Sequence, residues 1–379
     1  MRETSWRDAS GKRHSALWPS ELEPPSRPPL LVDDGTTAAA ALRRARAGAY
    51  LLYQGDYHNA RQLLAAMGRR LERGRRGPGG DLRARWRSVR AARREDHQVL
   101  SRLLVPVDQE LRLPLRRSPD VREALAHALG EAPAGPFLLP LREVLGAIGS
   151  REWHEKGVEV PALGGRVHPR HGVFAPVRGE HVALVAEELA SFPLAGKVAF
   201  DIGTGTGVLA LLLARAGATV VATDLAPSAV LSAREEAARW RLADRVEVRE
   251  ADLFPEGRAD LVVANPPWLP GEPETPLDRA VYDPGGEFLR RFLSGLGDHL
   301  ASAGEAWLVL SDLAEILGLR PPDEFEGALA RNRLTVVGRR SARPQHPRSK
   351  EARDPLHEAR ARETVTLYRL RPSLHPGEP

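Results

Sequence analysis

A glycine-rich turn between two apolar runs is the feature of the sequence that most limits its fold. Lys197–Phe200 has the composition of a short buried strand, and Val208–Ala214 has that of a buried helix. The turn between them reads Asp201-Ile-Gly-Thr-Gly-Thr-Gly207. A strand, a glycine turn and a helix in this order open the nucleotide-binding half of a doubly wound α/β fold. The chain is therefore expected to contain a domain of this class.

The spacing of Gly203, Gly205 and Gly207 discriminates between cofactors. A dinucleotide site requires Gly-x-Gly-x-x-Gly to hold a pyrophosphate, and this pattern starts at none of the three. S-adenosylmethionine (SAM) has no phosphate, but it has an ammonium group that can pair with a carboxylate such as Asp201. Its adenosine needs a close approach of the backbone, which glycine permits. The motif therefore predicts a SAM site.

A second acid supports the same cofactor. Ala218–Thr223 predicts the next strand, and Asp224 at its end follows Asp201 by 23 residues. This is close to the offset of about 20 residues at which an acid binds ribose hydroxyls in such folds. Asp252 and Asn265 complete the candidate cofactor contacts.

A second motif predicts the acceptor side of the reaction. Asn265-Pro266-Pro267-Trp268 follows the strand-like run Ala259–Ala264, and ligands of such sheets bind at the carboxyl ends of strands. The Asn265 side-chain oxygen and the Pro266 carbonyl can each accept one N–H of a planar amine or amide, which aims the nitrogen lone pair at a methyl donor. Pro267 stiffens the turn, and Trp268 offers a face for a planar group. These four residues are the catalytic candidates, although by itself the string also fits a proline-rich loop.

Both motifs together resemble class I SAM-dependent methyltransferases of the Asn-Pro-Pro-aromatic branch. That branch methylates exocyclic amines of nucleic-acid bases or the amide of glutamine. The closest resemblance is to the HemK-type release-factor glutamine methyltransferases, in which the acceptor motif continues as Leu269-Pro270 and a turn such as Gly285-Gly286 precedes a helix. The segment Val173–Glu180 is similar to the family's entry into its first helix.

The resemblance covers about residues 166–371. It implies a Rossmann-like, seven-stranded doubly wound sheet with an antiparallel last strand, and SAM as the cofactor. Glu180 and Trp268 become candidate substrate contacts. Trp268 stands where the family usually has Tyr, and the loop 339–362 is longer and more basic than the family pattern.

The rest of the chain is expected to form further segments. Residues 1–35 are Pro-rich and predict a mostly disordered lead, 36–156 a basic helical domain, 157–371 the methyltransferase domain and 372–379 a tail. Gly48–Ala60 resembles a tetratricopeptide turn, but only one copy is present, so it predicts a local helical hairpin. The helices expected in this domain are Thr37–Tyr53, Asp56–Glu72, Asp81–Leu104, Pro119–Leu129 and Pro140–Trp153.

Positive charge is concentrated in two places. Between Arg43 and Asp96 there are fifteen arginines against five carboxylates, whereas the whole chain has a net charge of +5. The loop 339–362 is also arginine-rich, and Arg343 and Arg348 are candidate substrate contacts. Such clusters are typical of a polyanion partner, but the chain has only four lysines, so a compositional preference for arginine explains them equally well.

Other features narrow the class of protein. The chain has no cysteine, and its N-terminus lacks the apolar core of a signal peptide. No run approaches the ~18 apolar residues of a membrane span. A soluble, cytoplasmic protein is expected, with no metal site, because His168 and His171 lie in a loop without ligand spacing.

Three functions remain open from the sequence: methylation of a glutamine in a release factor or ribosomal protein, methylation of a base in ribosomal or transfer RNA or in DNA, and a non-catalytic binding module. The order above is the order of preference. The sequence makes no prediction of the oligomeric state.

Overall fold

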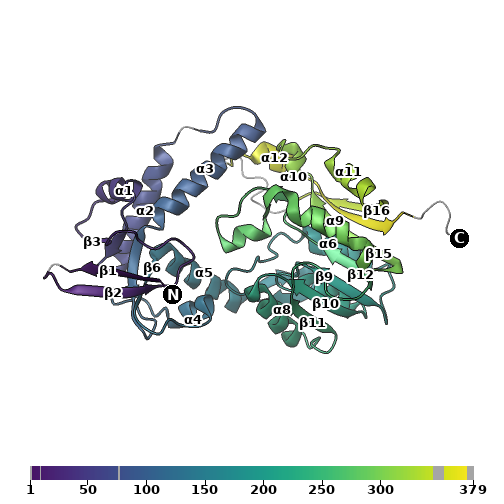
Figure 1. Cartoon of the computed structure of the whole chain (residues 1–379), viewed down its shortest axis with the longest axis horizontal. Coiled ribbons are helices and arrows are strands. Elements are labelled where there is room, and N and C mark those ends of the chain that lie inside the picture. The colour runs from purple at the N-terminus through teal and green to yellow at the C-terminus, as the bar shows by residue number, and fades with distance from the viewer. Residues whose placement is uncertain (1, 9, 76, 345–353, 374–379) are drawn as a thin grey trace. The chain divides into compact units, whose positions relative to one another are not determined.

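The computed structural model describes residues 2–8, 10–75, 77–344 and 354–373. Its chain forms two compact units, whose elements are labelled in Figure 1. Unit 1 comprises Met1–Pro78 and Arg87–Glu152, and unit 2 comprises Gly79–Trp86 and Trp153–Pro379. Helix α3 (Leu82–Leu100) begins in unit 2 and ends in unit 1. The division falls near the predicted boundary at residue 156, except that the short segment 79–86 joins unit 2.

Unit 2 contains the predicted doubly wound sheet. Its seven strands lie in the order β11-β10-β9-β12-β15-β17-β16, and β17 is antiparallel to both of its neighbours. The other pairings are parallel. The strands are β9 (Val198–Ile202), β10 (Thr219–Asp224), β11 (Val246–Glu250), β12 (Ala259–Ala264), β15 (Leu300–Ser311), β16 (Leu334–Ala342) and β17 (Val365–Pro372). The expected fold, including its antiparallel last strand, is confirmed.

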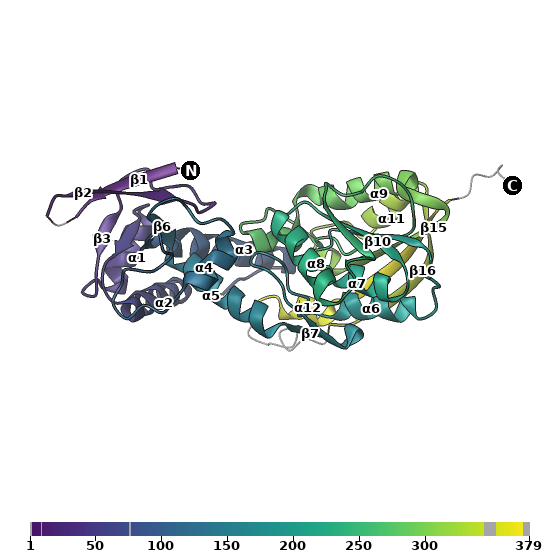
Figure 2. The same ribbon diagram turned by 90° about the horizontal axis from the view of Figure 1, so that it is seen from below.

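Helices cover both faces of this sheet. Figure 2 shows α9 and α11 on one side of the strands and α6 and α7 on the other. Successive residues of a strand pack on opposite faces of the sheet. Ala199 belongs to the buried cluster that contains α7, and its neighbour Phe200 belongs to the cluster that contains α9. The helices are α6 (Glu180–Leu189), α7 (Val208–Arg215), α8 (Pro227–Arg239), α9 (Glu287–His299), α10 (Leu313–Ile316), α11 (Glu324–Arg331) and α12 (His357–Arg362).

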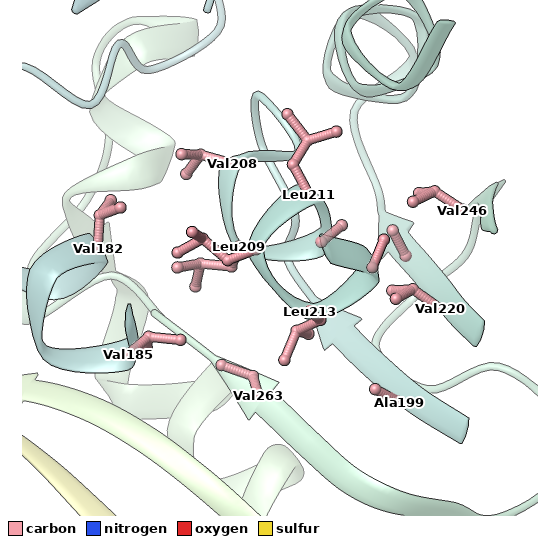
Figure 3. Packing of buried hydrophobic residues seen from close by; sticks show 14 of the residues in the cluster. Val182, Val185, Ala199, Val208, Leu209, Leu211, Leu213, Val220, Val246 and Val263 are labelled. Carbon is pink, nitrogen blue, oxygen red and sulfur yellow. The ribbon is translucent and has the colours of Figure 1, made fainter. Parts of the chain in front are cut away.

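Helix α7 lies at the centre of the larger core. In Figure 3 its Val208 and Leu209 point toward Val182 of α6, and Leu213 points toward Val263 of β12. A helix that is apolar all round must be buried on every side, and each residue from Val208 to Ala214 is buried. This packing places the N-terminus of α7 directly after the glycine turn.

Short elements complete unit 2. Two pairs of short strands, β7 with β8 and β13 with β14, form separate two-stranded sheets. Their bounds are β7 (Val158–Val160), β8 (Gly165–Val167), β13 (Leu269–Pro270) and β14 (Tyr282–Asp283), and 3-10 helices span Pro161–Leu163, Pro276–Ala280 and Pro284–Gly286.

Unit 1 is an α/β structure, which corrects the expectation of an all-helical domain. Its six-stranded sheet has the order β1-β2-β6-β5-β4-β3, in which β3, β4 and β5 are parallel neighbours. The strands are β1 (Arg2–Arg7), β2 (Arg13–Trp18), β3 (Leu30–Val32), β4 (Leu51–Tyr53), β5 (Leu103–Val107) and β6 (Phe137–Pro140). The other helices are α1 (Ala38–Arg46), α2 (Tyr57–Arg73), α4 (Arg122–Leu129) and α5 (Leu141–Lys156).

The lead before residue 36 is folded, so the prediction of disorder is wrong. Ala16 and Trp18 are buried on β2, whereas Ser15 is exposed and Leu17 is only partly buried, the alternation of a half-buried strand. The Trp18 indole donates to the carbonyl of Leu22 at 2.7 Å, and the Tyr50 hydroxyl donates to the carbonyl of Glu23 at 2.7 Å. These bonds hold the Pro-rich stretch against the sheet.

The predicted helix Thr37–Tyr53 is also wrong beyond residue 46. Gly48 has a φ of 94°, which ends α1, and the buried run Leu51–Tyr53 forms β4 between β3 and β5. The segment predicted as a helical hairpin therefore forms strand β4 between the helices α1 and α2. The next helix, α2, is confirmed, and Asp56 caps it by accepting from the His58 N–H at 2.9 Å.

The predicted helix Asp81–Leu104 ends at Leu100, because Leu103 already begins β5.

Among the residues that the structure describes, no helix combines the length and the apolar character needed to span a bilayer.

Candidate cofactor and acceptor site

The predicted site residues gather at one edge of the sheet of unit 2. Asp201 lies near the end of β9, Asp224 ends β10, Asp252 follows β11 and Asn265 follows β12. These four strands are neighbours in the order β11-β10-β9-β12 and run parallel. Their carboxyl ends therefore meet at the same edge, where open α/β sheets bind ligands.

The glycine turn requires its glycines for two different reasons. Gly203, Gly205 and Gly207 have φ values of 71°, 54° and 80°, a left-handed region that other residues rarely adopt. A Cβ at Gly207 would lie 3.1 Å from the Cα and Cβ of Ala233 on α8, so this glycine permits close packing. A Cβ at Gly205 would meet nothing within 4 Å. The backbone at Gly205 therefore borders open space, as a loop that cradles a ligand must.

Asp201 is buried and holds the turn together. Its Oδ2 accepts from the Thr204 hydroxyl at 2.6 Å and from the Ala210 N–H at 2.9 Å. Burial raises the pKa of this carboxyl to about 6, and the hydrogen bonds from Thr204 and Ala210 oppose that rise. The side chain thus fastens the glycine turn to the first turn of α7. Its predicted contact with the SAM ammonium stays a prediction.

Asp224 contacts the same turn from the next strand. One carboxylate oxygen accepts from the Gly205 N–H at 3.0 Å, and the other accepts from the Ala226 N–H at 2.9 Å. Burial raises the pKa of Asp224 above its usual range. Asp252 is more exposed and pairs with Arg291 at 2.7 Å. Asp224 therefore contacts the turn directly, whereas Asp252 pairs with a cation on α9.

The acceptor motif is fixed by its own tryptophan. The Trp268 Nε1–H donates to Asn265 Oδ1 at 3.1 Å and to the carbonyl of Val309 on β15 at 3.2 Å. The guanidinium carbon of Arg178 lies 5.6 Å from the centroid of the indole ring, over its face. Trp268 is also packed against the buried clusters of both sheet faces. The indole is therefore part of the wall of the site, and Asn265 is oriented by it.

The glycine pair after the acceptor motif adopts the expected turn. Gly285 and Gly286 have φ values of 60° and 70° and precede α9. Asp283 accepts from the N–H of Phe288 at 2.9 Å, and a Cβ at Gly203 would lie 3.7 Å from the Phe288 ring. The segment after Trp268 therefore returns to the glycine turn.

An ionic cluster at this edge was not among the predicted site residues, apart from Glu180. Arg178 pairs with Glu363 at 3.1 Å and lies 3.6 Å from Glu180. Glu363 is only 1% exposed and accepts from the Ser311 hydroxyl at 2.7 Å. Ser311 ends β15 and Glu363 precedes the antiparallel β17, so the topology brings them together. The sequence signal for Ser311 is its place directly after an apolar strand.

Asp312 follows Ser311 and accepts from the Thr364 N–H at 2.7 Å. Burial raises the pKa of Asp312, and the nearby carboxylates of Glu315 and Glu363 add to the rise. The end of β15 therefore lies near the carboxylates of Asp312, Glu315 and Glu363, of which Glu315 pairs with Arg320 and Glu363 with Arg178.

The described first part of the basic loop lies at the same edge. Strand β16 continues to Ala342, so Arg343 is exposed just beyond the carboxyl end of the strand. The loop is partly helical, since α12 occupies its last part, and Glu358 on α12 pairs with Arg85 of the segment 79–86 at 3.3 Å. The predicted contact Arg348 lies outside the described residues.

Comparison with known proteins identifies the class of unit 2. Residues 179–266 match the family model described as Ribosomal protein L11 methyltransferase (PrmA). This match and the sheet order are those of the class I SAM-dependent methyltransferase fold, which unit 2 adopts.

Individual relatives are similar over part of the chain. The release factor glutamine methyltransferase of Cereibacter sphaeroides is 39% identical over 124 residues, which are 28% of this chain and 44% of that protein. The ribosomal protein L11 methyltransferase of Vibrio cholerae is 36% identical over 123 residues, 32% of this chain and 41% of that protein. The chain thus spans less than half the length of these relatives. The crystal structure of a ribosomal protein L11 methylase from Lactobacillus delbrueckii subsp. bulgaricus matches 51% of this chain and 78% of its own, with 20% identity and a TM-score of 0.36.

Proposed function

We propose that the chain is a SAM-dependent N-methyltransferase whose acceptor is a planar amide nitrogen, most simply a glutamine side chain of a translation-associated protein. The observation that carries this proposal is the position of Asn265. Its strand β12 pairs directly with β9, which ends at the glycine turn. An amide oxygen held by Trp268 therefore lies one strand away from the cradle for the methyl donor.

The residues of the cradle fit SAM. The open space at Gly205 allows a flat group to approach the backbone, and Asp224 at the end of β10 can accept from ribose hydroxyls in addition to its bond from Gly205. Asp252 and the backbone around Gly203 are the other groups that we assign to the SAM site. When bound, SAM supplies an electrophilic methyl group on a sulfonium.

The acceptor side has to make a poor nucleophile reactive. The lone pair of an amide nitrogen is delocalised, and hydrogen bonds that hold both of its N–H groups favour the localised form. Asn265 Oδ1 accepts one bond from Trp268 and retains a second lone pair. This lone pair and the Pro266 carbonyl are the groups that we assign to the two N–H groups of the acceptor. Preorganised contacts of this kind stabilise the transition state without reorganisation.

The names of the relatives support a protein substrate. They act on a release factor or on ribosomal protein L11 by name, and such a substrate would place the activity in the cytoplasm. A base amine of RNA or DNA is the second candidate, because Arg343 is exposed at the same edge and can contact phosphate. A non-catalytic module is the third, and it predicts SAM binding without methyl incorporation.

Asn265→Ala tests the assignment. Turnover should fall by roughly 10²–10³, the usual effect of deleting one preorganised contact, while calorimetric SAM affinity stays within about twofold. The assay measures tritium transfer from labelled SAM into a ribosome-rich lysate, treated in parallel with nuclease or protease. Asn332→Ala, at the C-terminus of α11, is the matched control and should be fully active.

The treatments separate the substrate classes. Protease-sensitive, nuclease-resistant incorporation supports the glutamine acceptor. Nuclease-sensitive incorporation would transfer the assignment to a base amine. Full activity of Asn265→Ala would remove the planar-nitrogen mechanism altogether.

A further inference from the structure

Two helices of unit 1 present a dense set of exposed arginines, which we call the arginine face. Helices α1 and α2 pack against each other, and their apolar sides lie in the core of unit 1. Their outward sides carry the exposed residues Arg43, Arg44, Arg61, Arg69, Arg70 and Arg73. Glu72 is the one acidic residue within the two helices.

These arginines have no acidic partner among the residues of unit 1 that the structure describes. Among the described residues, none of the six forms an ion pair, whereas Arg46 of the same helix α1 pairs with Glu95 at 2.8 Å. Like charges on neighbouring turns of a helix repel one another by a few tenths of a kcal/mol. Apart from Arg61, whose guanidinium lies 5.9 Å from the centroid of the Tyr57 ring, the arginines of the face therefore have no evident role in folding unit 1, and their arrangement suits the binding of an anion.

The helical positions give the surface a direction and a length. On α2 the buried residues Leu63, Leu64 and Met67 face the core, and Arg69 and Arg73, one turn apart, lie on the opposite side. From Arg61 to Arg73 the helix rises by about 18 Å, at 1.5 Å per residue. An extended polyanion fits this spacing better than a single small anion does.

We infer that the arginine face binds the phosphate backbone of a structured RNA. Guanidinium groups match phosphate geometry through paired hydrogen bonds. A protein interface normally has apolar or aromatic anchors at its centre, yet none of the exposed large hydrophobic residues among the described residues lies on α1 or α2. A membrane-surface helix exposes an apolar side beside its cationic one, whereas the apolar sides of these helices are buried.

The choice of RNA over DNA rests on the translation-associated substrate proposed above. The assignment of the arginine face as a surface that binds phosphate is independent of that substrate. RNA binding is measured without SAM and without methyl transfer. A failure of the RNA assignment is thus distinguishable from a failure of the proposed reaction.

The test is fluorescence anisotropy of a labelled RNA hairpin with the full chain. With five or six phosphate contacts, affinity should fall on the order of 10²-fold or more between 50 and 200 mM salt, because each contact contributes about 0.7–0.9 to the slope of log K against log salt. The variant Arg69→Gln/Arg70→Gln/Arg73→Gln should reduce this slope by about two and weaken binding at low salt by about tenfold or more.

A matched control removes the same charge elsewhere. Arg122, Arg249 and Arg239 each pair with a carboxylate, at Asp120, Glu247 and Glu236. Their triple change to Gln should leave RNA affinity within about twofold. Equal weakening by the control would show a net-charge effect and overturn the assignment of the face.

Two further measurements test whether the partner is RNA, and not DNA or an acidic peptide. The DNA hairpin of the same sequence should bind no more tightly than the RNA hairpin, and a polyglutamate peptide should compete only weakly with the RNA. Tighter DNA binding, or competition by polyglutamate as strong as that by unlabelled RNA, would overturn the RNA assignment. A wild-type chain that does not bind the RNA hairpin at low salt would do the same.

Discussion

Arginine has opposite roles around Glu305 in unit 2 and on the arginine face of unit 1. On the sheet of unit 2, Arg369 and Arg371 converge on Glu305, which is completely buried, at 2.7 and 2.6 Å. On α1 and α2 of unit 1, the arginines of the arginine face are exposed and have no acidic partner among the described residues. A compositional preference for arginine would act on both units alike. The arginines around Glu305 therefore stabilise the fold, and the inferred role of the arginine face is binding.

The largest expected effect is on the folding of unit 2. Glu305→Gln leaves the guanidinium groups of Arg369 and Arg371, whose side chains are 27% and 50% exposed, beside a neutral amide. Breaking a fully buried ion pair costs about 3 kcal/mol or more, and solvent around the two arginines reduces this cost to about 2 kcal/mol. The free energy of unfolding of unit 2 should fall by about this amount in a denaturant titration that monitors Trp307, whose indole donates to Glu305 at 3.2 Å.

Glu326→Gln is the comparison variant, because Glu326 pairs with Arg339 at 3.6 Å and both side chains are mostly exposed. Exposed pairs contribute between about 0 and 1 kcal/mol. Equal stability of the two variants would mean that the arginines around the buried Glu305 are no more important for folding than the exposed Arg339.

A buried acid of unit 2 should make SAM binding depend on pH. Burial raises the pKa of Asp201 to about 6, so the carboxyl is mostly neutral at pH 5 and ionised at pH 7.5. If the ionised form binds the SAM ammonium, affinity should be about tenfold weaker at pH 5, one pKa unit below the midpoint. Calorimetry of the wild-type chain and of Asp201→Asn measures this, and the variant should show a flat profile between the two pH values.

The same pKa predicts the sign of a stability effect. Because the folded pKa lies above the ordinary value of 3.8, the folded state binds the proton more tightly than the unfolded state does. This contribution to stability is complete below pH 4 and is lost as the pH rises through 6.

A wild-type SAM affinity that is constant from pH 5 to 7.5 would contradict the predicted contact with SAM. Asp201 would then serve only as a structural anchor of the glycine turn.

Unit 2 could be predicted from its sequence because its central strands are buried on both faces. The run Leu261–Ala264 is continuously apolar, as parallel strands are, and the glycine motif marks the next helix. In unit 1 the run Leu51–Tyr53 is equally apolar, but it follows α1 so closely that it extends the helical pattern. Only its pairing with β3 and β5 makes it a strand, and pairing is not visible in a single segment.

The site also has residues whose positions could be predicted from the sequence and residues whose positions could not. Asp201, Asp224 and Asn265 follow strands and belong to short motifs, so their gathering at one edge could be predicted. Arg178 and Glu363 are 185 residues apart, and they meet only because β17 runs antiparallel and begins where β15 ends. A contact of this kind depends on the tertiary fold and leaves no local pattern.

The smallest expected effect is the one that tests the unit 1 side of the comparison. Arg69→Gln/Arg70→Gln/Arg73→Gln removes three charges from α2, but these side chains are exposed and take part in no ion pair of unit 1 among the described residues. Gln and Arg have similar helix propensities, and surface changes away from special features alter stability by less than about 0.5 kcal/mol. The unfolding transition of unit 1 should therefore be unchanged, or slightly more stable as repulsion is relieved. A loss of 1 kcal/mol or more would show that these arginines stabilise unit 1, and the contrast with the arginines around Glu305 would then disappear.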